Sequence, residues 1–343
     1  MITLLSMAAI TMAGSNFKSA PPEWVVYEGK HGPGKGKSVV SLSGDEEYRS
    51  EEGLPQLAKI LAYRFGFKCT VLFSVNPSGE IDPNTQDNEP GLEALDSADL
   101  CVMLLRFRHW PDAQMKHFAD YYLSGKPFIA LRTSTHAFDY KAHPDSLYHK
   151  YDWQSQEWPG GFGKQVLGET WLSHWGNHGV EGTRGILAGN SKHPILKGVK
   201  GIFGTTDVYE AHPPPDAEVL VWGQVLSSLH PTDPPSTRSK ATSAGVEQGV
   251  NDPMMPIVWL RQPVNAAGKR NHVLTTTMGA ATDLQNEGLR RLLVNGCLWS
   301  VGLSNKITDR LNVNLVGEYA PSKFGFGAFK KGVKPSDLAQ IHG

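Results

Sequence analysis

The sequence predicts an α/β protein with an open, mostly parallel β-sheet flanked by helices. Short apolar runs of strand length recur along the chain, and several are followed by segments whose apolar residues repeat every three or four positions. Polar turns rich in glycine and proline separate these segments. Alternation of strand and helix is typical of parallel strands joined by right-handed crossovers. With 343 residues and no visible internal repeat, one domain is expected.

The first half of the chain shows this alternation most clearly. The spacing of Leu54, Leu57 and Leu61 predicts a helix. A second helix begins near Pro111, because proline is favoured in the first helical turn, and it ends at Gly125. Four largely apolar runs predict strands: residues 39–43, 70–75, 99–105 and 128–131. The last of them is the apolar run of a strand that is buried on both faces.

The second half of the chain is less regular. Residues 227–253 are rich in serine, proline, threonine and glycine and are expected to form a surface insertion. A last helix is predicted after Asp283, a favoured N-cap residue, with Leu289 and Leu293 in its apolar stripe. Four further strands are predicted: residues 184–188, 218–225, 256–260 and 272–277.

The two ends of the chain differ from its middle. Residues 1–15 combine an apolar core with a small-residue end, which is typical of a secretory signal peptide and too short for a membrane span. We therefore expect a periplasmic or secreted protein. Residues 16–37 are expected to be a flexible leader, residues 38–303 the α/β domain, and residues 304–343 a tail that wraps the surface.

Composition narrows the class of partner. The 33 Lys and Arg residues nearly balance the 34 Asp and Glu residues, and no basic stripe is visible. This balance argues against nucleic acid or an anionic membrane as the main partner. Cys69 and Cys101 fall in predicted strands and Cys297 falls in a predicted helix, so buried free thiols are expected rather than a disulfide framework.

Polar clusters follow the ends of several predicted strands. In a parallel sheet these turns share one rim, and ligands bind in the crevice beyond the carboxyl ends of the strands. The segment from Phe128 to His136 shows the pattern best, because an apolar strand leads directly into Arg, Thr, Ser, Thr and His. The four clusters are Glu46/Glu47/Arg49, Arg106/Arg108/His109, Arg132–His136 and Met278–Asp283.

Each candidate in these clusters has a structural alternative. His136 is the strongest single candidate for chemistry, since histidine titrates near neutral pH; the alternative is a hydrogen-bonded structural histidine. Glu47 and Arg49 could pair with each other or favour the start of the following helix. Arg106 could bridge buried carbonyl or carboxylate groups. Thr133 could bond the backbone of its own turn.

A metal site is a further candidate. His174 and His178 are four residues apart, a spacing that on a helix would place two imidazoles on one face, as metal sites use. Gly176 and Gly179 favour a loop at this position, however, and in a loop a spacing of four residues does not place two side chains on the same face. The pair is therefore a weak metal signal.

Two other kinds of chemistry stay open. Tryptophans crowd a glycine-rich segment, and their flat apolar faces suit stacking on sugar rings, although packing is the ordinary role of any single tryptophan. A Ser-His-Asp hydrolase is conceivable, but no G-x-S-x-G motif surrounds the serine. The tryptophans are Trp153, Trp158, Trp171 and Trp175, and the hydrolase candidates are Ser134, His136 or His174, and Asp207 or Asp283.

Seven short motifs follow one another across residues 38–302: Val39–Arg49, Leu104–Arg108, Ile129–Phe138, Leu167–His174, His193–Gly198, Thr206–Tyr209 and Val273–Gly279. In this order they resemble ThuA-like (trehalose utilisation) proteins. The resemblance implies the class I glutamine amidotransferase-like, flavodoxin-like fold, in which three layers place a mostly parallel sheet between helices. The amidotransferase cysteine is absent, with Thr133 and Ser134 in its region, so the resemblance does not imply glutaminase activity.

The resemblance links the chain to the catabolism of disaccharides and keto-sugars, often beside a sugar dehydrogenase. Carried over by position, it implies Glu47, Arg49, His136, His174 and Asp207 as site residues. It also implies a divalent metal ion as the candidate cofactor and no nucleotide cofactor. The chain departs from the family in two turns. Residues 132–136 stand where many relatives have a simpler histidine turn, and Gly279-Ala280 stands where many have a Gly-His pair.

Together these observations predict an exported enzyme that acts on a keto-glycoside or keto-disaccharide by acid–base, metal-assisted elimination or hydrolysis. A keto group acidifies the neighbouring C–H bond, so the reaction needs a general base and an oxyanion stabiliser. The alternative is a non-catalytic carbohydrate-binding protein on the same scaffold. The expected partners are a small-molecule carbohydrate, a second copy of the chain and a sugar dehydrogenase of the same pathway. Catalytic candidates are His136, His174, Glu47 and Arg49; substrate-binding candidates are Arg106, Arg132, Thr133, Trp171, Trp175 and Asp207; metal candidates are His136, His174 and His178.

Overall fold

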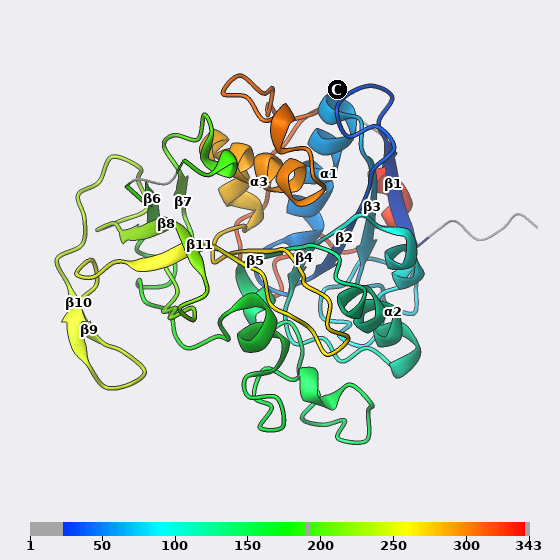
Figure 1. The fold of residues 1–343 in the computed structure, drawn as a ribbon, viewed down its shortest axis with the longest axis horizontal. Coiled ribbons are helices and arrows are strands. Elements are labelled where there is room, and N and C mark those ends of the chain that lie inside the picture. Colours follow the sequence, from blue (N-terminus) through cyan, green and yellow to red (C-terminus); the bar gives the residue numbers. More distant parts are fainter. Residues whose placement is uncertain (1–22, 190–191, 340–343) are drawn as a thin grey trace, which may run out of the picture.

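A computed structural model describes residues 23–189 and 192–339. Its centre is a ten-stranded sheet with the strand order β1-β3-β2-β4-β5-β12-β11-β8-β6-β7 (Figure 1). β9 (Ser239–Ala241) and β10 (Glu247–Gly249) form a separate two-stranded sheet. The ten strands are β1 (Trp24–Glu28), β2 (Ser38–Gly44), β3 (Lys68–Phe73), β4 (Leu100–Leu105), β5 (Phe128–Leu131), β6 (Thr183–Leu187), β7 (Phe203–Gly204), β8 (Glu218–Val225), β11 (Met255–Arg261) and β12 (Val273–Thr276).

The central strands β3, β2, β4, β5 and β12 are parallel to one another. Numbered by their order in the chain they run 2-1-3-4-5, so the connection that leaves β2 goes to one side and the connection that leaves β4 goes to the other. A crevice opens beyond the carboxyl ends of strands at such a switch point, and ligands of open α/β sheets bind there. The α/β class is thereby confirmed.

The sheet as a whole is mixed, so the prediction of a mostly parallel sheet was wrong. β11, β8, β6 and β7 pair antiparallel with one another, and β11 is antiparallel to β12. At the opposite edge β1 is antiparallel to β3. Parallel neighbours need a long crossover, usually a helix. The segment between β8 and β11 contains only β9 and β10, and the one between β11 and β12 is a short loop.

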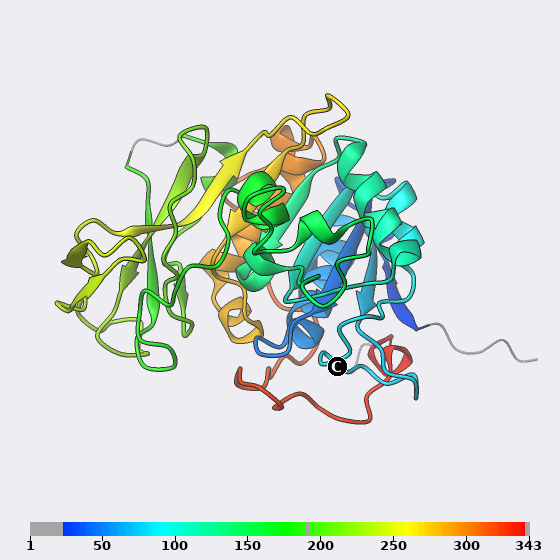
Figure 2. The ribbon, with the colours of Figure 1, turned by 90° about the horizontal axis from the view of Figure 1, so that it is seen from below.

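Helices cover both faces of the parallel strands. α1 (Ser50–Phe65) and α3 (Glu287–Ser300) lie on one face, and α2 (Asp112–Leu123) lies on the other (Figure 1). Leu57 of α1 and Leu293 of α3 belong to one buried apolar cluster, whereas Met115 and Phe118 of α2 belong to a second. The sheet separates the two clusters, which gives three layers. Figure 2 shows the antiparallel strands extending beyond these layers at one end.

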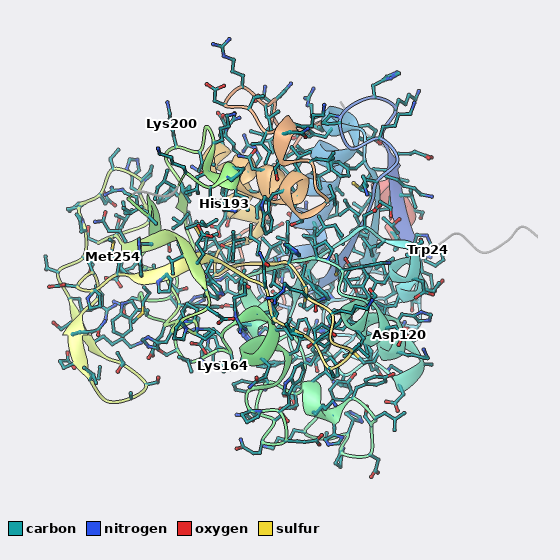
Figure 3. The ribbon with its side chains drawn as sticks, in the orientation of Figure 1. Trp24, Asp120, Lys164, His193, Lys200 and Met254 are labelled. Atoms are coloured by element: carbon teal, nitrogen blue, oxygen red, sulfur yellow. The ribbon has the colours of Figure 1, made fainter. Side chains whose placement is uncertain are left out.

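The N-terminal part differs from the flexible leader that the sequence suggests. Residues 24–28 form the edge strand β1, which begins at Trp24 (Figure 3) and buries Val25 and Tyr27. The Tyr27 hydroxyl donates to the carbonyl of Leu338 at 2.7 Å, so the C-terminal segment secures this edge. The predicted signal peptide, residues 1–15, lies outside the described residues.

The cysteines confirm one prediction from the sequence. Cys69, Cys101 and Cys297 are all buried and free, the first two in strands and the third in α3.

A separate observation concerns the helices. Among the residues that the structure describes, no helix is long and apolar enough to cross a membrane.

The last helix begins later than the sequence predicts. Asn286, and not Asp283, is its N-cap, because the Asn286 side-chain oxygen accepts a hydrogen bond from the backbone N–H of Leu289 at 2.9 Å. Asp283 instead accepts from Thr206 Oγ1 at 2.7 Å and from the backbone N–H of Gly279 at 3.1 Å. This buried carboxylate joins the turn after β12 to the segment after β7.

The C-terminal segment runs across the rim formed by the ends of the parallel strands (Figure 2). The Tyr319 hydroxyl donates to the carbonyl of Ala281 at 2.7 Å, in the turn after β12. The backbone N–H of Gly325 then donates to the carbonyl of Glu47 at 2.8 Å, in the turn after β2. Residues 324–326 are therefore placed beside the predicted site.

Candidate functional site

Residues in the left-handed backbone region mark the carboxyl ends of β2, β4 and β5. Arg49 (φ 57°), Phe107 (φ 56°) and Arg132 (φ 44°) are the non-glycine residues with positive φ in the described part of the chain. This conformation costs an L-residue about 1–2 kcal/mol. Such strain persists only where the surrounding structure holds it, and it clusters at functional sites. All three residues lie on the predicted rim.

Buried hydrogen bonds join the turns after β2, β5 and β12. Asp45 accepts from the Thr133 hydroxyl and from the backbone N–H of Glu47, the latter at 2.8 Å. Arg132 donates to the carbonyl of Thr277 at 2.8 Å. These contacts confirm that the turns after the parallel strands converge on one rim.

Arg132 is the buried anchor of this rim. Its guanidinium is inaccessible to solvent and lies 4.4 Å from the ring centroid of Tyr48 and 4.0 Å from that of Tyr209. It donates to Oδ1 and to the backbone carbonyl of Asp207, both at 2.8 Å. Burial raises the pKa of the Asp207 carboxyl, but Arg132 and two histidines lower it more, so the net pKa is below its ordinary value. Asp207 is therefore charged at neutral pH.

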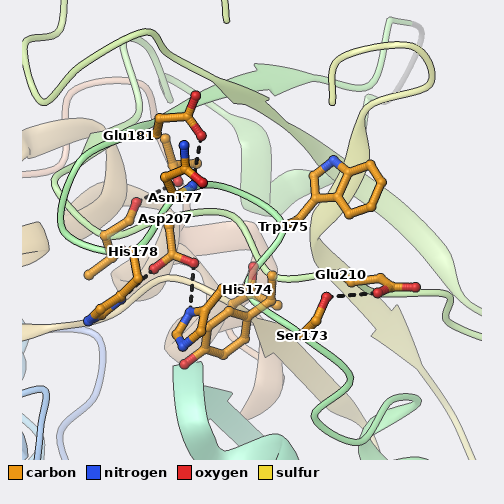
Figure 4. A network of polar contacts seen from close by, with 12 residues as sticks. Ser173, His174, Trp175, Asn177, His178, Glu181, Asp207 and Glu210 are labelled. Atoms are coloured by element: carbon orange, nitrogen blue, oxygen red, sulfur yellow. Dashed lines mark hydrogen bonds and ion pairs between the residues drawn. The ribbon is translucent and has the colours of Figure 1, made fainter. Parts of the chain in front are cut away.

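The two histidines in contact with Asp207 are His174 and His178 (Figure 4). Nδ1 of His174 is 2.9 Å from Oδ2 of Asp207, and Nδ1 of His178 is 3.0 Å from Oδ1. Both come from an irregular loop, as the nearby glycines indicate, and their ring centroids are 4.6 Å apart. The loop brings the two imidazoles together without the helix that the spacing rule assumes.

His178 is a cation between two carboxylates. While Nδ1 faces Asp207, Nε2 lies 2.9 Å from Oε1 of Glu47. The hydrogen bonds to Asp207 and to Glu47 raise the pKa of His178 to about 9. The imidazolium is therefore the dominant form at neutral pH, and its positive charge lies directly beside His174.

His174 has the arrangement of a general base. Its Nδ1 is occupied by Asp207, whereas Nε2 has no hydrogen-bond partner among the residues that the structure describes. The side chain is 36% exposed, so this nitrogen is open to a ligand. A carboxylate that accepts from Nδ1–H fixes the tautomer with its lone pair on Nε2.

The insertion that precedes β11 holds the histidine loop in place. Arg238 donates to the carbonyl of Trp175 at 3.0 Å, and Lys240 donates to the carbonyl of His174. Trp175 is fully buried, and its Nε1 donates to the carbonyl of Val250 at 2.9 Å. Trp175, which the sequence suggests as a substrate contact, thus packs in the protein interior and fixes the loop.

His136 lies at the floor of the site in its neutral form. Its side chain is 3% exposed, and its ring centroid is 5.2 Å from Phe107 and 5.9 Å from Trp171. Burial, and then the positive charge of Arg106, lower the pKa of His136 well below its ordinary range. Nδ1 lies 3.1 Å from the Thr135 hydroxyl. A neutral imidazole here can accept a hydrogen bond or a proton.

Partly exposed aromatic rings form an arc around the histidines. Successive ring centroids are 5.5 Å apart for Phe107 and Trp153, 6.4 Å for Trp153 and Trp171, and 5.8 Å for Trp171 and His174. Trp158 is not part of this arc, because it lines a separate cleft beside α2. We call Phe107, Trp153 and Trp171 the aromatic arc.

The turn after β4 carries one buried and one accessible arginine. Arg108 is fully buried and forms an ion pair with the Glu46 carboxylate. The Arg106 side chain is 21% exposed and lies 3.4 Å from the other Glu46 oxygen. Its guanidinium carbon is 4.4 Å from the ring centroid of Phe107 and 4.9 Å from that of Phe326.

The C-terminal segment closes one side of the site. Phe324 packs against Tyr48 and His178, with ring centroids 5.4 and 5.5 Å apart. Arg49 is buried beneath this segment and donates to the carbonyl of Gly325 at 3.2 Å. Arg49, a catalytic candidate from the sequence, therefore contacts protein atoms and holds the segment in place.

The donor set of His174, His178 and Asp207 fits a divalent metal ion. One ligand atom from each residue lies within 4.8 Å of the others. Imidazole and carboxylate together form a common donor set for Zn²⁺ and other first-row ions. The His178 imidazolium would have to lose a proton to bind the ion, so affinity would rise with pH. His136, the third metal candidate from the sequence, is not part of this cluster.

The turn after β5 presents no nucleophile. Its strained position is Arg132, and the next two residues are buried. The Ser134 hydroxyl donates to the carbonyl of Met103 at 2.9 Å and accepts from the backbone N–H of Leu105 at 3.2 Å, and the Thr133 hydroxyl donates to a carboxylate. These contacts argue against the Ser-His-Asp hydrolase.

Comparison with known proteins adds limited information. No family model and no curated protein matches the chain. The chain is similar to solved ThuA-like proteins from Bacteroides uniformis ATCC 8492 (18% identity, TM-score 0.47, 82% of this chain and 96% of that chain) and Parabacteroides merdae ATCC 43184 (14%, 0.45, 85% and 98%). It is also similar to the N-terminal domain of mmIFT52 (11%, 0.36, 78% and 98%). TM-scores below 0.5 establish neither a shared fold nor a function, so the functional argument rests on the site.

Some residues of the site were not identified from the sequence. Tyr48 and Tyr209 enclose Arg132, and each lies within a motif of which only the charged members were taken as site candidates. Phe324 and Phe326 come from the C-terminal segment, which the sequence marks only as polar and rich in glycine and lysine. The position of each tyrosine next to a candidate charged residue is the signal that could have identified it. The C-terminal segment has no comparable sequence signal for Phe324 and Phe326.

Proposed function

We propose that the protein is an enzyme that acts on keto-glycosides by removing the proton next to a keto group. The observation that carries the proposal is the His174–Asp207 pair, which leaves the lone pair of His174 on Nε2, on a loop beside the turns that follow the parallel strands. The amidotransferase-like, flavodoxin-like fold and the sugar substrate are supported by the resemblance to ThuA-like proteins and by the order of the parallel strands.

The proposed reaction is an elimination. Nε2 of His174 takes the proton from the carbon next to the keto group, and the electrons of that C–H bond form an enediolate. Collapse of the enediolate forms a carbon–carbon double bond and breaks the glycosidic C–O bond. The departing oxygen takes a proton and leaves as an alcohol. Addition of water to the double bond would complete a net hydrolysis.

His178 supplies charge stabilisation in this scheme. Its imidazolium is fixed by Asp207 and Glu47 before any ligand arrives, and its ring centroid is 4.6 Å from that of the base. A preorganised positive charge stabilises a developing oxyanion without reorganisation during the reaction. Glu47 and Asp207 therefore position this cation.

The sugar ring is proposed to stack on the aromatic arc. Phe107, Trp153 and Trp171 present partly exposed apolar faces beside His136 and His174. Aromatic faces with polar edges suit a sugar, which has apolar C–H faces and hydroxyl edges. Neutral His136 would accept a hydrogen bond from a sugar hydroxyl.

A divalent metal ion is proposed as the cofactor of an alternative scheme, because it would occupy the same residues as the His174 base and the His178 cation. His174, His178 and Asp207 would hold it. When bound, it would polarise the keto oxygen as a Lewis acid. With His174 engaged as a ligand, neutral His136 is the remaining imidazole of the site, and burial and the nearby arginines make it a weak base.

A second candidate function is carbohydrate binding without catalysis. The aromatic arc favours it, because stacking on three rings does not require the histidine pair. Under this function, affinity for a sugar depends on Trp153 and Trp171 and is insensitive to substitution of His174.

The test is turnover of a 3-keto-glucoside by the purified protein, with metal content measured before and after chelation. His174→Gln and His136→Gln are compared with His230→Gln, an exposed histidine in the insertion. We expect loss of about 100-fold or more in rate for His174→Gln, as for removal of a general base. Unchanged turnover in both site variants would contradict the mechanism. Sugar binding without turnover in the wild type would establish the second candidate.

A further inference from the structure

We propose that the ligand of this site carries an anionic group, such as the carboxylate of a sugar acid, and that Arg106 binds it. The inference rests on the proposed function and deepens it, because it narrows the substrate from a keto-glycoside to an acidic one. Its basis is the distribution of charge on the rim, where Arg106 differs from every other charged side chain of the site.

The other cationic groups of the rim are paired with protein carboxylates or covered by protein atoms. Arg132, Arg108 and the partly exposed His178 imidazolium each have a carboxylate partner, so none of them offers an accessible, unpaired N–H group to a ligand carboxylate. Arg49 is covered by the C-terminal segment and cannot contact a ligand. The pairs are Arg132 with Asp207, Arg108 with Glu46, and His178 with Glu47.

Arg106 has only a shared and distant counter-charge. Its Nη1 is 3.4 Å from Oε2 of Glu46, well beyond the 2.7–2.9 Å or so that is usual for a charge-assisted hydrogen bond. The same carboxylate is already paired with Arg108. One carboxylate thus faces two guanidinium groups, and the accessible Arg106 has the longer contact with it.

Aromatic rings hold the Arg106 guanidinium in a defined place. Phe107 and Phe326 both contact it, at 4.4 and 4.9 Å from the ring centroids. Contacts of this kind engage the face of the planar cation and leave its edge N–H groups for hydrogen bonds in the plane. Two parallel N–H groups match the two oxygens of a carboxylate.

The position of Arg106 connects it to the catalytic histidines. Phe107, on which it stacks, contacts the ring of His136 at 5.2 Å. Phe326, its second ring, is two residues from Phe324, which contacts His178 at 5.5 Å. A carboxylate on Arg106 therefore belongs to a ligand that also reaches the histidines. Phe326 itself is 62% exposed, an unusual position for a phenylalanine without a partner to cover it.

The experiment compares binding of methyl β-glucuronide and methyl β-glucoside by calorimetry. The two sugars differ only in a carboxylate in place of a hydroxymethyl group. Wild type is compared with Arg106→Gln, with Arg106→Lys, and with Arg310→Gln as a matched control at an exposed arginine. We expect the wild type and the control to bind the glucuronide roughly 10- to 100-fold more tightly than the glucoside, the size of a hydrogen bond to a charged group.

In Arg106→Gln the preference for the glucuronide over the glucoside should disappear, and Arg106→Lys should keep part of that preference. In wild type, added salt should reduce the preference, which tests the inference even if a variant fails to fold. An equal affinity for both sugars in wild type, or an unchanged preference in Arg106→Gln, would overturn the anionic subsite alone. Failure of wild type to bind either sugar would overturn the proposed function together with the subsite.

Discussion

Nδ1 of His174 lies 2.9 Å from Oδ2 of Asp207, and Oδ1 of the same carboxylate accepts a hydrogen bond from Arg132 at 2.8 Å. The carboxylate is fully buried, whereas the imidazole is only partly buried. Asp207 is held by the buried Arg132 and in turn holds the accessible imidazole of His174. Arg132 acts through Asp207 and is a positioning residue.

Asp207→Asn is expected to lower the free energy of unfolding by about 3–5 kcal/mol, because it leaves the buried Arg132 without its carboxylate. His174→Gln removes a half-exposed partner of the same carboxylate and should cost about 1 kcal/mol or less. Urea denaturation of both variants and the wild type gives the comparison. Equal losses in the two variants would show that Arg132 does not depend on Asp207.

Glu89 should make stability fall as pH rises. Burial raises the pKa of this carboxyl to about 8 in the folded state, although Arg108 opposes the shift, and neither carboxyl oxygen has a hydrogen-bond partner among the described residues. A raised carboxyl pKa means that the folded state binds more protons than the unfolded one. The contribution of Glu89 to the free energy of unfolding is therefore fully present below the pKa of the unfolded state, near 4.5. It is lost as pH rises through about 8, the pKa of the folded state.

The variant that tests this effect is Glu89→Gln, with the exposed Glu93→Gln as control. At pH 8.5 or so, Glu89→Gln should be more stable than wild type relative to the same comparison at low pH, by about 5 kcal/mol at most. Denaturation curves at several pH values measure the difference. A pH profile of Glu89→Gln that coincides with that of wild type would be incompatible with a buried, unpaired carboxyl.

Removal of tryptophan rings should distinguish the aromatic arc from the cleft beside α2 as the place where sugar binds. Trp153→Ala and Trp171→Ala shorten the aromatic arc and should weaken sugar binding several-fold, since each ring offers an apolar face to the ligand. Trp158→Ala alters the separate cleft beside α2 and should leave binding at the site unchanged. Calorimetry with a glucoside measures all three. Weaker binding in Trp158→Ala alone would move the sugar site to the cleft.

Phe326→Ala tests the C-terminal wall of the site. Loss of this ring removes one of the two aromatic contacts of Arg106, and an exposed cation–π contact is worth about 0.5–1 kcal/mol. Affinity for an anionic sugar should therefore fall by about two- to five-fold, less than for Arg106→Gln. Phe329→Ala, in the same segment, is the control. An unchanged affinity would mean that Phe326 does not hold the arginine.

The elements that position the site could be predicted from the sequence because their cause is local. Residues 128–131 and 218–225 have the strand boundaries that their apolar runs indicate. Burial on both faces selects uninterrupted apolar runs, so the parallel strands and the polar turns that follow them were recognisable. The direction of β8 and β11 was not, because it depends on the connecting segments rather than on the strands themselves.

The site was predictable only in part, because its residues lie in local motifs but their contacts join distant segments of the chain. His136, His174 and Asp207 stand next to predicted strand ends or within recognisable motifs. The contacts that give them their chemistry join distant segments: Arg132 reaches Asp207 across 75 positions, and Arg49 reaches Gly325 across 276. No periodic pattern records such contacts. The spacing of His174 and His178 was informative, but a loop and not a helix brings them together.

The most direct test of His174 as the base is proton exchange in heavy water. A 3-keto-glucoside is incubated with the protein in D₂O, and NMR follows loss of the proton next to the keto group and release of the alcohol. We predict rapid exchange or elimination with wild type, and a rate lower by about 100-fold or more with His174→Gln. Exchange at the rate of buffer alone with wild type, or at an equal rate with His174→Gln, would contradict the proposed mechanism.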